Sequence, residues 1–137
     1  MGNTKTILIV DDDIHFQILT QRLVGQMGHT VLSASNGSEA LRILYTTKID
    51  ILLLDLNLGN TGISGWDILY ITHNDDKLKD LPIAIVSNAV EDQLNEYVQK
   101  VQTPGGSKTS PRITMTKPVN RQDLLRFMAL VETESKK

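Results

Sequence analysis

The sequence predicts an α/β fold built on a parallel sheet that helices cover on both faces. Short runs rich in Ile, Leu and Val recur along the chain, and the stretches between them show the spacing of amphipathic helices. The third run is apolar on both alternating faces after Asp50, which is typical of a strand buried between two helical layers. The five expected strands are residues 7–10, 30–34, 49–54, 83–86 and 113–116.

Helical periodicity is clearest in three of the remaining stretches. Phe16, Leu19, Leu23 and Met27 are separated by three, four and four residues, and Gly28 follows where a helix C-cap is expected. This pattern predicts a first helix that packs these four side chains on the sheet. Two more helices are predicted by the i, i+3, i+4, i+7 pattern, through Leu94, Tyr97, Val98 and Val101 and through Leu124, Phe127, Met128 and Val131.

Right-handed crossovers between parallel strands leave few topologies for five βα units. The flavodoxin-like strand order 2-1-3-4-5, doubly wound and with five helices, is a common one and is the order predicted here. The length of 137 residues and the hydrophobic content of 40% fit one domain over residues 1–137, with a core of about residues 5–133 and a short polar tail. The segment from Thr103 to Pro111 predicts an inserted loop, whose role is open.

The composition excludes several classes of function. There is no cysteine, which rules out disulfides, thiolate metal sites and a cysteine nucleophile. A net charge of −2, from 14 basic and 16 acidic residues, gives no general attraction to nucleic acid or to an anionic membrane. The N-terminal residues contain neither a secretory hydrophobic region nor a membrane span, so a cytoplasmic protein is expected.

Acidic residues follow two strands that are expected to be neighbours. Asp11, Asp12 and Asp13 follow the first strand and Asp55 follows the third. Ligands of an open α/β sheet bind beyond the carboxyl ends of its strands where the strand order reverses, which here is between these two strands. Carboxylates gathered there would repel one another, so the pattern indicates a hard divalent cation, with octahedral Mg²⁺ favoured over Ca²⁺ and Zn²⁺. The alternative for the triplet is a solvated strand end in which Asp13 caps the next helix.

Two further strand ends carry groups that suit phosphoryl chemistry. Ser87 closes the fourth strand, and Lys117 closes the fifth, just before Pro118. Each has an ordinary alternative, which is a turn hydroxyl for Ser87 and a solvated or ion-paired ammonium for Lys117. Together with a metal, however, a hydroxyl donor and an ammonium can neutralise and position phosphoryl oxygens. Asp55 would then be a carboxylate nucleophile that attacks phosphorus.

These elements, in this order, resemble the receiver domains of bacterial two-component response regulators, of the chemotaxis single-domain type. The resemblance covers nearly the whole chain and rests on the segments 7–13 and 51–57, on Ser87 and on Lys117 with Pro118. It implies that Asp55 accepts a phosphoryl group from a sensor histidine kinase or a phosphotransfer protein.

The resemblance also assigns roles to the other site residues. It implies that Asp12, Asp55 and the Asn57 main-chain carbonyl ligate Mg²⁺, while Asp11 acts mainly through metal-bound water. Ser87 would hydrogen-bond the phosphoryl group. Lys117 would form an ion pair with the carboxylate or the phosphoryl group, and the peptide bond to the following proline would be cis.

The implied function is a phosphorelay switch, not an enzyme with a separate substrate. Such a domain catalyses only its own phosphorylation and dephosphorylation, and thereby changes its binding to a downstream protein that the sequence does not identify. A phosphorylation-linked homodimer is a further state to test. No contact with nucleic acid or membrane is expected.

Two features depart from the family's usual pattern. Thr114 stands three positions before Lys117, where receivers usually have an aromatic switch residue, so the usual rotamer flip cannot operate here. The loop over residues 58–65 lacks the common proline and is longer than usual.

Two other functions are kept as alternatives. The first is a Mg²⁺-dependent phosphatase of the haloacid-dehalogenase type, because residues 11–15 match part of its Asp-x-Asp-x-Thr/Val motif, although His15 stands at the last position. The second is a pseudo-receiver that binds a partner without phosphorylation. The histidines His15, His29 and His73 share no metal-ligand spacing and are expected at the surface, and Trp66 is expected to pack the third helix on the sheet.

Overall fold

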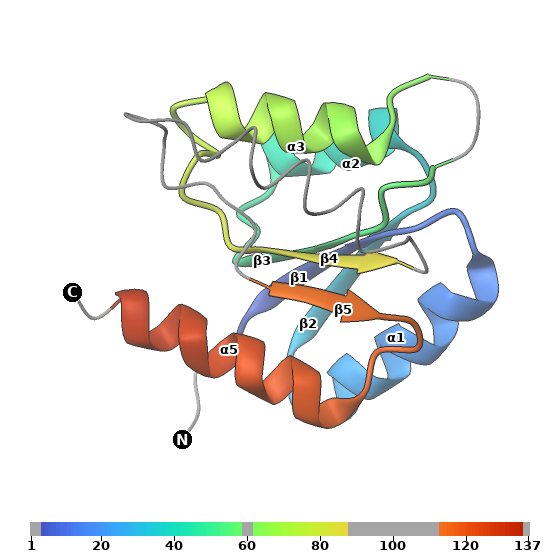
Figure 1. The fold of residues 1–137 in the computed structure, drawn as a ribbon, viewed down its shortest axis with the longest axis vertical. Helices are drawn as coiled ribbons and strands as arrows, with labels where there is room; N and C mark the ends of the chain where they lie inside the picture. Colours follow the sequence, from blue (N-terminus) through green and yellow to red (C-terminus); the bar gives the residue numbers. More distant parts are fainter. Residues whose placement is uncertain (1–3, 59–61, 88–112, 136–137) are drawn as a thin grey trace.

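The computed structural model describes residues 4–58, 62–87 and 113–135. In these residues a parallel sheet of five strands lies between two helical layers (Figure 1). The strands are β1 (Thr6–Val10), β2 (Thr30–Ala34), β3 (Ile51–Leu54), β4 (Ile83–Ser87) and β5 (Ile113–Thr116). The helices are α1 (Ile14–Gln26), α2 (Gly37–Thr46), α3 (Gly65–Asn74) and α5 (Arg121–Ser135). The helix predicted over residues 94–101 and the loop over 103–111 lie outside the described residues.

The strand order is β2-β1-β3-β4-β5, which confirms the predicted topology. Val10 of β1 pairs with Ala34 on one side and with Leu54 on the other, so the strand order reverses at β1. The carboxyl ends of β1 and β3 therefore form the crevice in which an open α/β sheet binds its ligands. None of the described helices combines the length and the apolar character needed to cross a bilayer.

β3 is buried on both faces, as its continuous apolar sequence predicts. Leu52 and Leu54 pack in the core beneath α2 and α3, whereas Ile51 and Leu53 pack in the core beneath α1 and α5. Figure 1 shows these two pairs of helices on opposite sides of the sheet. The predicted face of α5 is also confirmed, because its four apolar residues are all buried: Leu124, Phe127, Met128 and Val131.

β3 begins two residues later than predicted, at Ile51 rather than Ile49. The Asp50 main-chain N–H donates to Thr6 O (2.8 Å), and the Asp50 carboxylate accepts from the Thr6 N–H (2.8 Å). The Asp50 side chain therefore takes the backbone donor at this end of β1, a local competition that aspartate often provides.

Three of the four residues predicted for the buried face of α1 pack on the core, with Phe16 buried and Leu23 and Met27 partly buried. Leu19 is 60% exposed, whereas Gln17 and Thr20 are buried beside Phe16 and Val24. The predicted end of the helix is confirmed by a pair of hydrogen bonds typical of a Schellman motif. The His29 N–H donates to Val24 O (3.3 Å) and the Gly28 N–H to Gly25 O (3.0 Å), while Gly28 adopts a φ of +91°.

The first residues of α2 and α3 lie directly against the backbone of the loop after β3. A Cβ on Gly37 would lie 2.3 Å from Ile63 O, and a Cβ on Gly65 would lie 2.3 Å from Asp55 O and 2.5 Å from Leu56 Cα. Only glycine allows an approach this close. Leu58 is buried in the same layer, so both flanks of the loop are fixed to the core.

We expect Gly65→Ala to destabilise the protein by about 1–3 kcal/mol. The added methyl group would clash with backbone atoms of Asp55 and Leu56, which cannot move out of the way as a flexible side chain could. Gly25→Ala in α1 is the matched control. A Cβ there meets nothing within 4 Å. Alanine should therefore raise stability by up to ~1 kcal/mol through its higher helix propensity. Urea unfolding of both variants measures the two signs, and equal stability of Gly65→Ala and wild type would contradict the close packing.

Candidate functional site

Two of the predicted site carboxylates continue the hydrogen-bond ladder of the sheet. The Asp11 N–H donates to Ala34 O (3.1 Å), and the Asp55 N–H donates to Val10 O (2.9 Å). Each aspartate directly follows the last paired residue of its strand, and the register of β1 with β3 makes them neighbours. The parallel sheet itself thus brings Asp11 and Asp55 together.

Asp11, Asp12 and Asp55 offer carboxylate oxygens that all lie within 4.8 Å of one another. Asp11 is fully buried and Asp55 is 5% exposed, whereas Asp12 faces solvent. Asp13 does not join this acidic cluster. Its carboxylate caps α1 by accepting from the N–H groups of His15 (2.9 Å) and the following residue (3.3 Å). The triplet therefore divides, with its first two members at the cluster and its third in the capping role given above as the alternative.

Lys117 reaches the acidic cluster from the end of β5. Its Nζ lies 2.7 Å from Asp11 Oδ2 and 3.0 Å from Asp55 Oδ2. The ammonium also lies 4.7 Å from the centroid of the Phe16 ring, which is a cation–π contact. The peptide bond between Lys117 and Pro118 is cis, as predicted.

Burial and charge act in opposite directions on these groups. Burial raises the pKa of the Asp11 carboxyl above its usual value, and the Lys117 ammonium and the Asp13 N–H offset only part of this effect. Burial would lower the pKa of Lys117, but hydrogen bonds to the Asp11 and Asp55 carboxylates outweigh it and the pKa is raised. Lys117 therefore keeps its positive charge, whereas burial disfavours the ionised form of the Asp11 carboxyl.

The two buried carboxylates have few donors for their oxygen atoms. Asp11 Oδ2 is buried, and its partner in the described part of the chain is the Lys117 ammonium, at 2.7 Å. Asp55 Oδ1, by contrast, accepts from the Asn57 N–H (3.0 Å). Three neighbouring carboxylates offer oxygen ligands and carry more negative charge than one ammonium neutralises, which fits a hard cation such as Mg²⁺.

Other predicted residues are placed as follows. Ser87 ends β4 and pairs with Thr116, so its backbone lies at the same sheet edge as Lys117. Thr114 is exposed. Trp66 packs against the core beneath α2 and α3, as expected.

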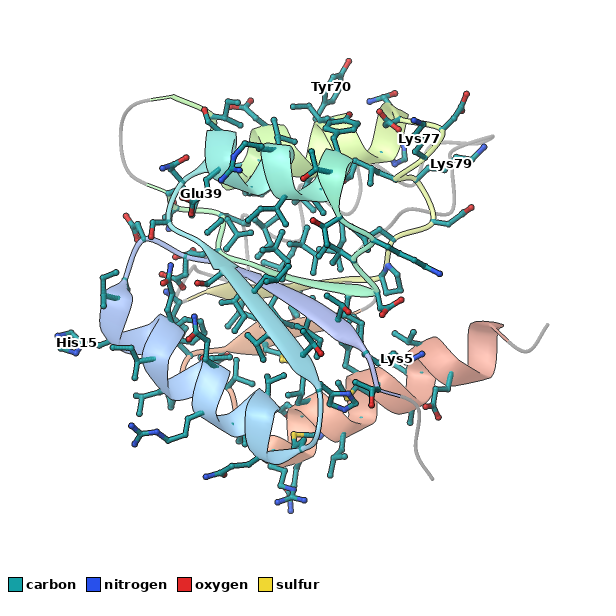
Figure 2. All side chains as sticks on the ribbon, turned by 180° about the vertical axis from the view of Figure 1, so that it is seen from behind. Lys5, His15, Glu39, Tyr70, Lys77 and Lys79 are labelled. Atoms are coloured by element: carbon teal, nitrogen blue, oxygen red, sulfur yellow. The ribbon has the colours of Figure 1, made fainter. Side chains whose placement is uncertain are left out.

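The histidines belong to other parts of the protein. His15 points away from the protein on α1 (Figure 2), and His29 Nδ1 accepts from the Lys5 N–H (3.0 Å) at the opposite edge of the sheet. His73 lies on α3 and is half-buried. Among the described residues, the group able to hold a metal ion contains aspartates alone.

Gln17 also adjoins the site, although its role was not predicted from the sequence. This residue is 6% exposed and its side-chain amide donates to the Asp11 main-chain carbonyl oxygen. The apolar spacing of α1 gave no signal for it, because its acceptors are main-chain oxygens that only the fold brings together.

The family model for the response regulator receiver domain matches residues 7–129. The chain belongs to this family.

Three similar proteins illustrate the match. The receiver is 35% identical over 95 residues to the chemotaxis protein CheY of Pseudomonas aeruginosa, covering 68% of this chain and 75% of CheY. It is 29% identical over 126 residues to the CAI-1 autoinducer sensor kinase/phosphatase CqsS of Vibrio cholerae, covering 91% of this chain but 17% of CqsS. A CheY-like receiver from Methanospirillum hungatei has the same fold, with a TM-score of 0.79 at 21% identity over 98% of both chains.

We expect Asp11→Asn to raise the Tm of this receiver in chelator, because the neutral amide removes a buried charge whose pKa is raised. A gain of ~1 kcal/mol would correspond to about 3–5 °C. A raised pKa means that the folded state binds the proton more tightly, so wild-type stability should also rise as the pH falls through the raised pKa of Asp11 toward the usual carboxyl range.

The variant should lack most of this pH dependence. The hydrogen bond from Tyr45 lowers the pKa of Asp75, and the stability that it contributes is lost only below the usual carboxyl range. Thermal melts at several pH values above that range would measure the difference. Parallel curves for wild type and Asp11→Asn would contradict the prediction.

Proposed function

We propose that this receiver is a phosphorelay switch that accepts a phosphoryl group on Asp55 in a Mg²⁺-dependent reaction. The single observation that carries the proposal is the acidic cluster with one ammonium in contact with both buried carboxylates. A merely structural ion pair needs one carboxylate for one ammonium, whereas here Lys117 contacts two carboxylates of a cluster of three. The excess negative charge would attract a divalent cation, and the bound cation would in turn attract the phosphoryl oxygens.

Asp11, Asp12, Asp55 and the Asn57 main-chain carbonyl would hold the Mg²⁺, Asp11 mainly through metal-bound water. When bound, the metal supplies charge neutralisation for the carboxylates and for the incoming phosphoryl oxygens. Among the residues themselves, the Asn57 N–H holds Asp55 Oδ1 and Lys117 holds Asp55 Oδ2, so the nucleophilic carboxylate is fixed in orientation before any donor arrives.

The transfer step follows from this arrangement. An Asp55 carboxylate oxygen forms a bond to phosphorus while the nitrogen–phosphorus bond of a phosphohistidine breaks, and the imidazole nitrogen keeps the electron pair and takes up a proton. Lys117 would then pair with a phosphoryl oxygen. Ser87 would donate a hydrogen bond to another, and this contact would bias the adjoining segment in place of an aromatic at Thr114.

Membership of the receiver family favours this function over the phosphatase alternative. The receiver would catalyse only its own phosphorylation and dephosphorylation. The pseudo-receiver alternative is disfavoured because the acidic cluster and Lys117 are all present. We further propose one domain with its core at about residues 5–133, in the cytoplasm, with an unidentified downstream protein as target and a phosphorylation-linked homodimer as a state to test.

A partner surface adjoins the site on α1. Ile14, Ile18 and Leu19 in the first two turns of α1 are each about half exposed or more. Ile14 directly follows Asp13, and Ile18 and Leu19 lie about one turn further along α1, so this surface begins next to the segment that carries Asp11 and Asp12. Apolar side chains placed next to a phosphoacceptor suit docking of a sensor histidine kinase or a phosphotransfer protein.

We expect acetyl phosphate with Mg²⁺ to add one phosphoryl unit to the wild-type protein and none to Asp55→Asn, because an amide is a poor nucleophile. Intact-protein mass spectrometry measures the addition. Asp50→Asn, which changes a carboxylate at the other edge of the sheet, is the matched control and should label normally. Asp12→Ala should lose labelling while it keeps its fold. Undiminished labelling of Asp55→Asn would refute the assignment.

We expect Ile18→Ser and Leu19→Ser each to slow phosphorylation by a phosphohistidine protein about tenfold, the loss typical of an interface side chain worth more than 1 kcal/mol. Labelling by acetyl phosphate should stay unchanged, because this small donor needs no docking surface. Tyr70→Ser serves as the control. Tyr70 is 70% exposed on α3, and it points away from the opposite helical layer (Figure 2). Equal slowing with both donors would place the effect in the site, not in docking.

A further inference from the structure

Gln17 is a buried polar residue whose contacts all lie at the carboxyl ends of β1 and β2. Its Nε2 donates to the main-chain oxygens of Asp11 and Ala34 (3.1 Å for the latter), and to Ser35 Oγ (3.3 Å). All three are oxygen atoms and the two carbonyls can only accept, so the amide must present its NH₂ group here. Ala34 O also accepts from the Asp11 N–H, so this one amide links both strand ends.

The hydrogen bond to the Asp11 carbonyl fixes more than that one oxygen. A peptide unit is planar, so the Asp11 C=O and the Asp12 N–H turn as one rigid plane. The next plane, which contains the Asp12 C=O and the Asp13 N–H, is held by a hydrogen bond from the Asp13 N–H to Asp11 Oδ1 (2.8 Å). Both peptide planes that flank Asp12 are thus held, one by Gln17 and one by Asp11.

The Asp12 side chain has no such support of its own. In the described part of the chain its exposed carboxylate has no hydrogen bond and no ion pair. Its position within 4.8 Å of the Asp11 and Asp55 oxygens is therefore set by the backbone on either side. A ligand oxygen that is positioned in advance binds a cation without losing further conformational freedom.

We infer that Gln17 is a positioning residue for the divalent-cation site, acting on Asp12 through the Asp11–Asp12 peptide plane. The inference rests on the proposed function, because it takes Asp12 as a ligand of the cation. It goes beyond that proposal by assigning cation affinity to a side chain that touches neither the metal nor the phosphoryl group.

The test compares Gln17→Met, which has a similar shape and no donor, with Thr20→Val, which removes a hydroxyl from the next turn of the same buried face. Isothermal titration calorimetry with MgCl₂ measures the dissociation constant. Gln17→Met should weaken Mg²⁺ binding about tenfold, the lower end of losses seen when a residue that supports a metal ligand is removed. Thr20→Val should stay within about twofold of wild type, because no such support is lost. Both variants should melt lower than wild type in EDTA.

A second measurement separates positioning from general loosening. In metal-free protein, ¹⁵N relaxation of the Asp12 amide should show increased motion in Gln17→Met but not in Thr20→Val, because that N–H belongs to the released peptide plane. Should Gln17→Met fail to fold, Gln17→Asn replaces it. This amide is one methylene too short to reach both strand ends, so it should produce a smaller change in the same direction.

The outcomes distinguish this inference from the proposed function. Wild-type protein that binds no Mg²⁺ refutes both. Wild-type binding with unchanged affinity in the Gln17 variants refutes the inference alone, as does equal weakening in Gln17→Met and Thr20→Val. Selective loss of affinity with a mobile Asp12 amide supports it.

Discussion

Two buried carboxylates at neighbouring strand ends share one ammonium, and much of the structure can be understood from this arrangement. The register of β1 with β3 forces Asp11 and Asp55 together, where two like charges would oppose folding. Lys117, which follows the edge strand β5, relieves part of that repulsion by pairing with both carboxylates. Asp12 adds a third carboxylate to the acidic cluster, so one ammonium leaves the cluster with net negative charge. Lys117 therefore allows the two buried carboxylates to fold together, while the remaining charge still favours binding of a cation.

Much of this was predictable from the sequence because local pattern and sheet geometry agree. Short runs of Ile, Leu and Val separated by helical stretches allow few topologies, and the observed order is the predicted one. Once the strands are parallel, their carboxyl ends share one edge, so the residues after β1, β3, β4 and β5 converge there whatever the loops do. For this reason Asp11, Asp12, Asp55 and Lys117 could be grouped without coordinates.

The sequence was less informative about which face of α1 is buried. Apolar spacing favoured Leu19 for the core, yet Gln17 and Thr20 occupy it. A buried amide is costly unless its donors find acceptors. Its acceptors are main-chain oxygens at the ends of two strands, and no sequence pattern records where those oxygens will lie. The stacking of Lys117 on Phe16 was invisible for a similar reason, because the two residues are about a hundred positions apart and meet only when the sheet closes.

The close approach of Gly37 to Ile63 has a consequence for how this chain can vary. Leu58 on one flank and Ile63 on the other are both seated in the same layer, and α2 begins directly against the second of them. A residue larger than glycine at position 37 would push Ile63, two residues before α3 begins, out of this layer. Substitution at the start of α2 is therefore constrained by the segment that leads into α3.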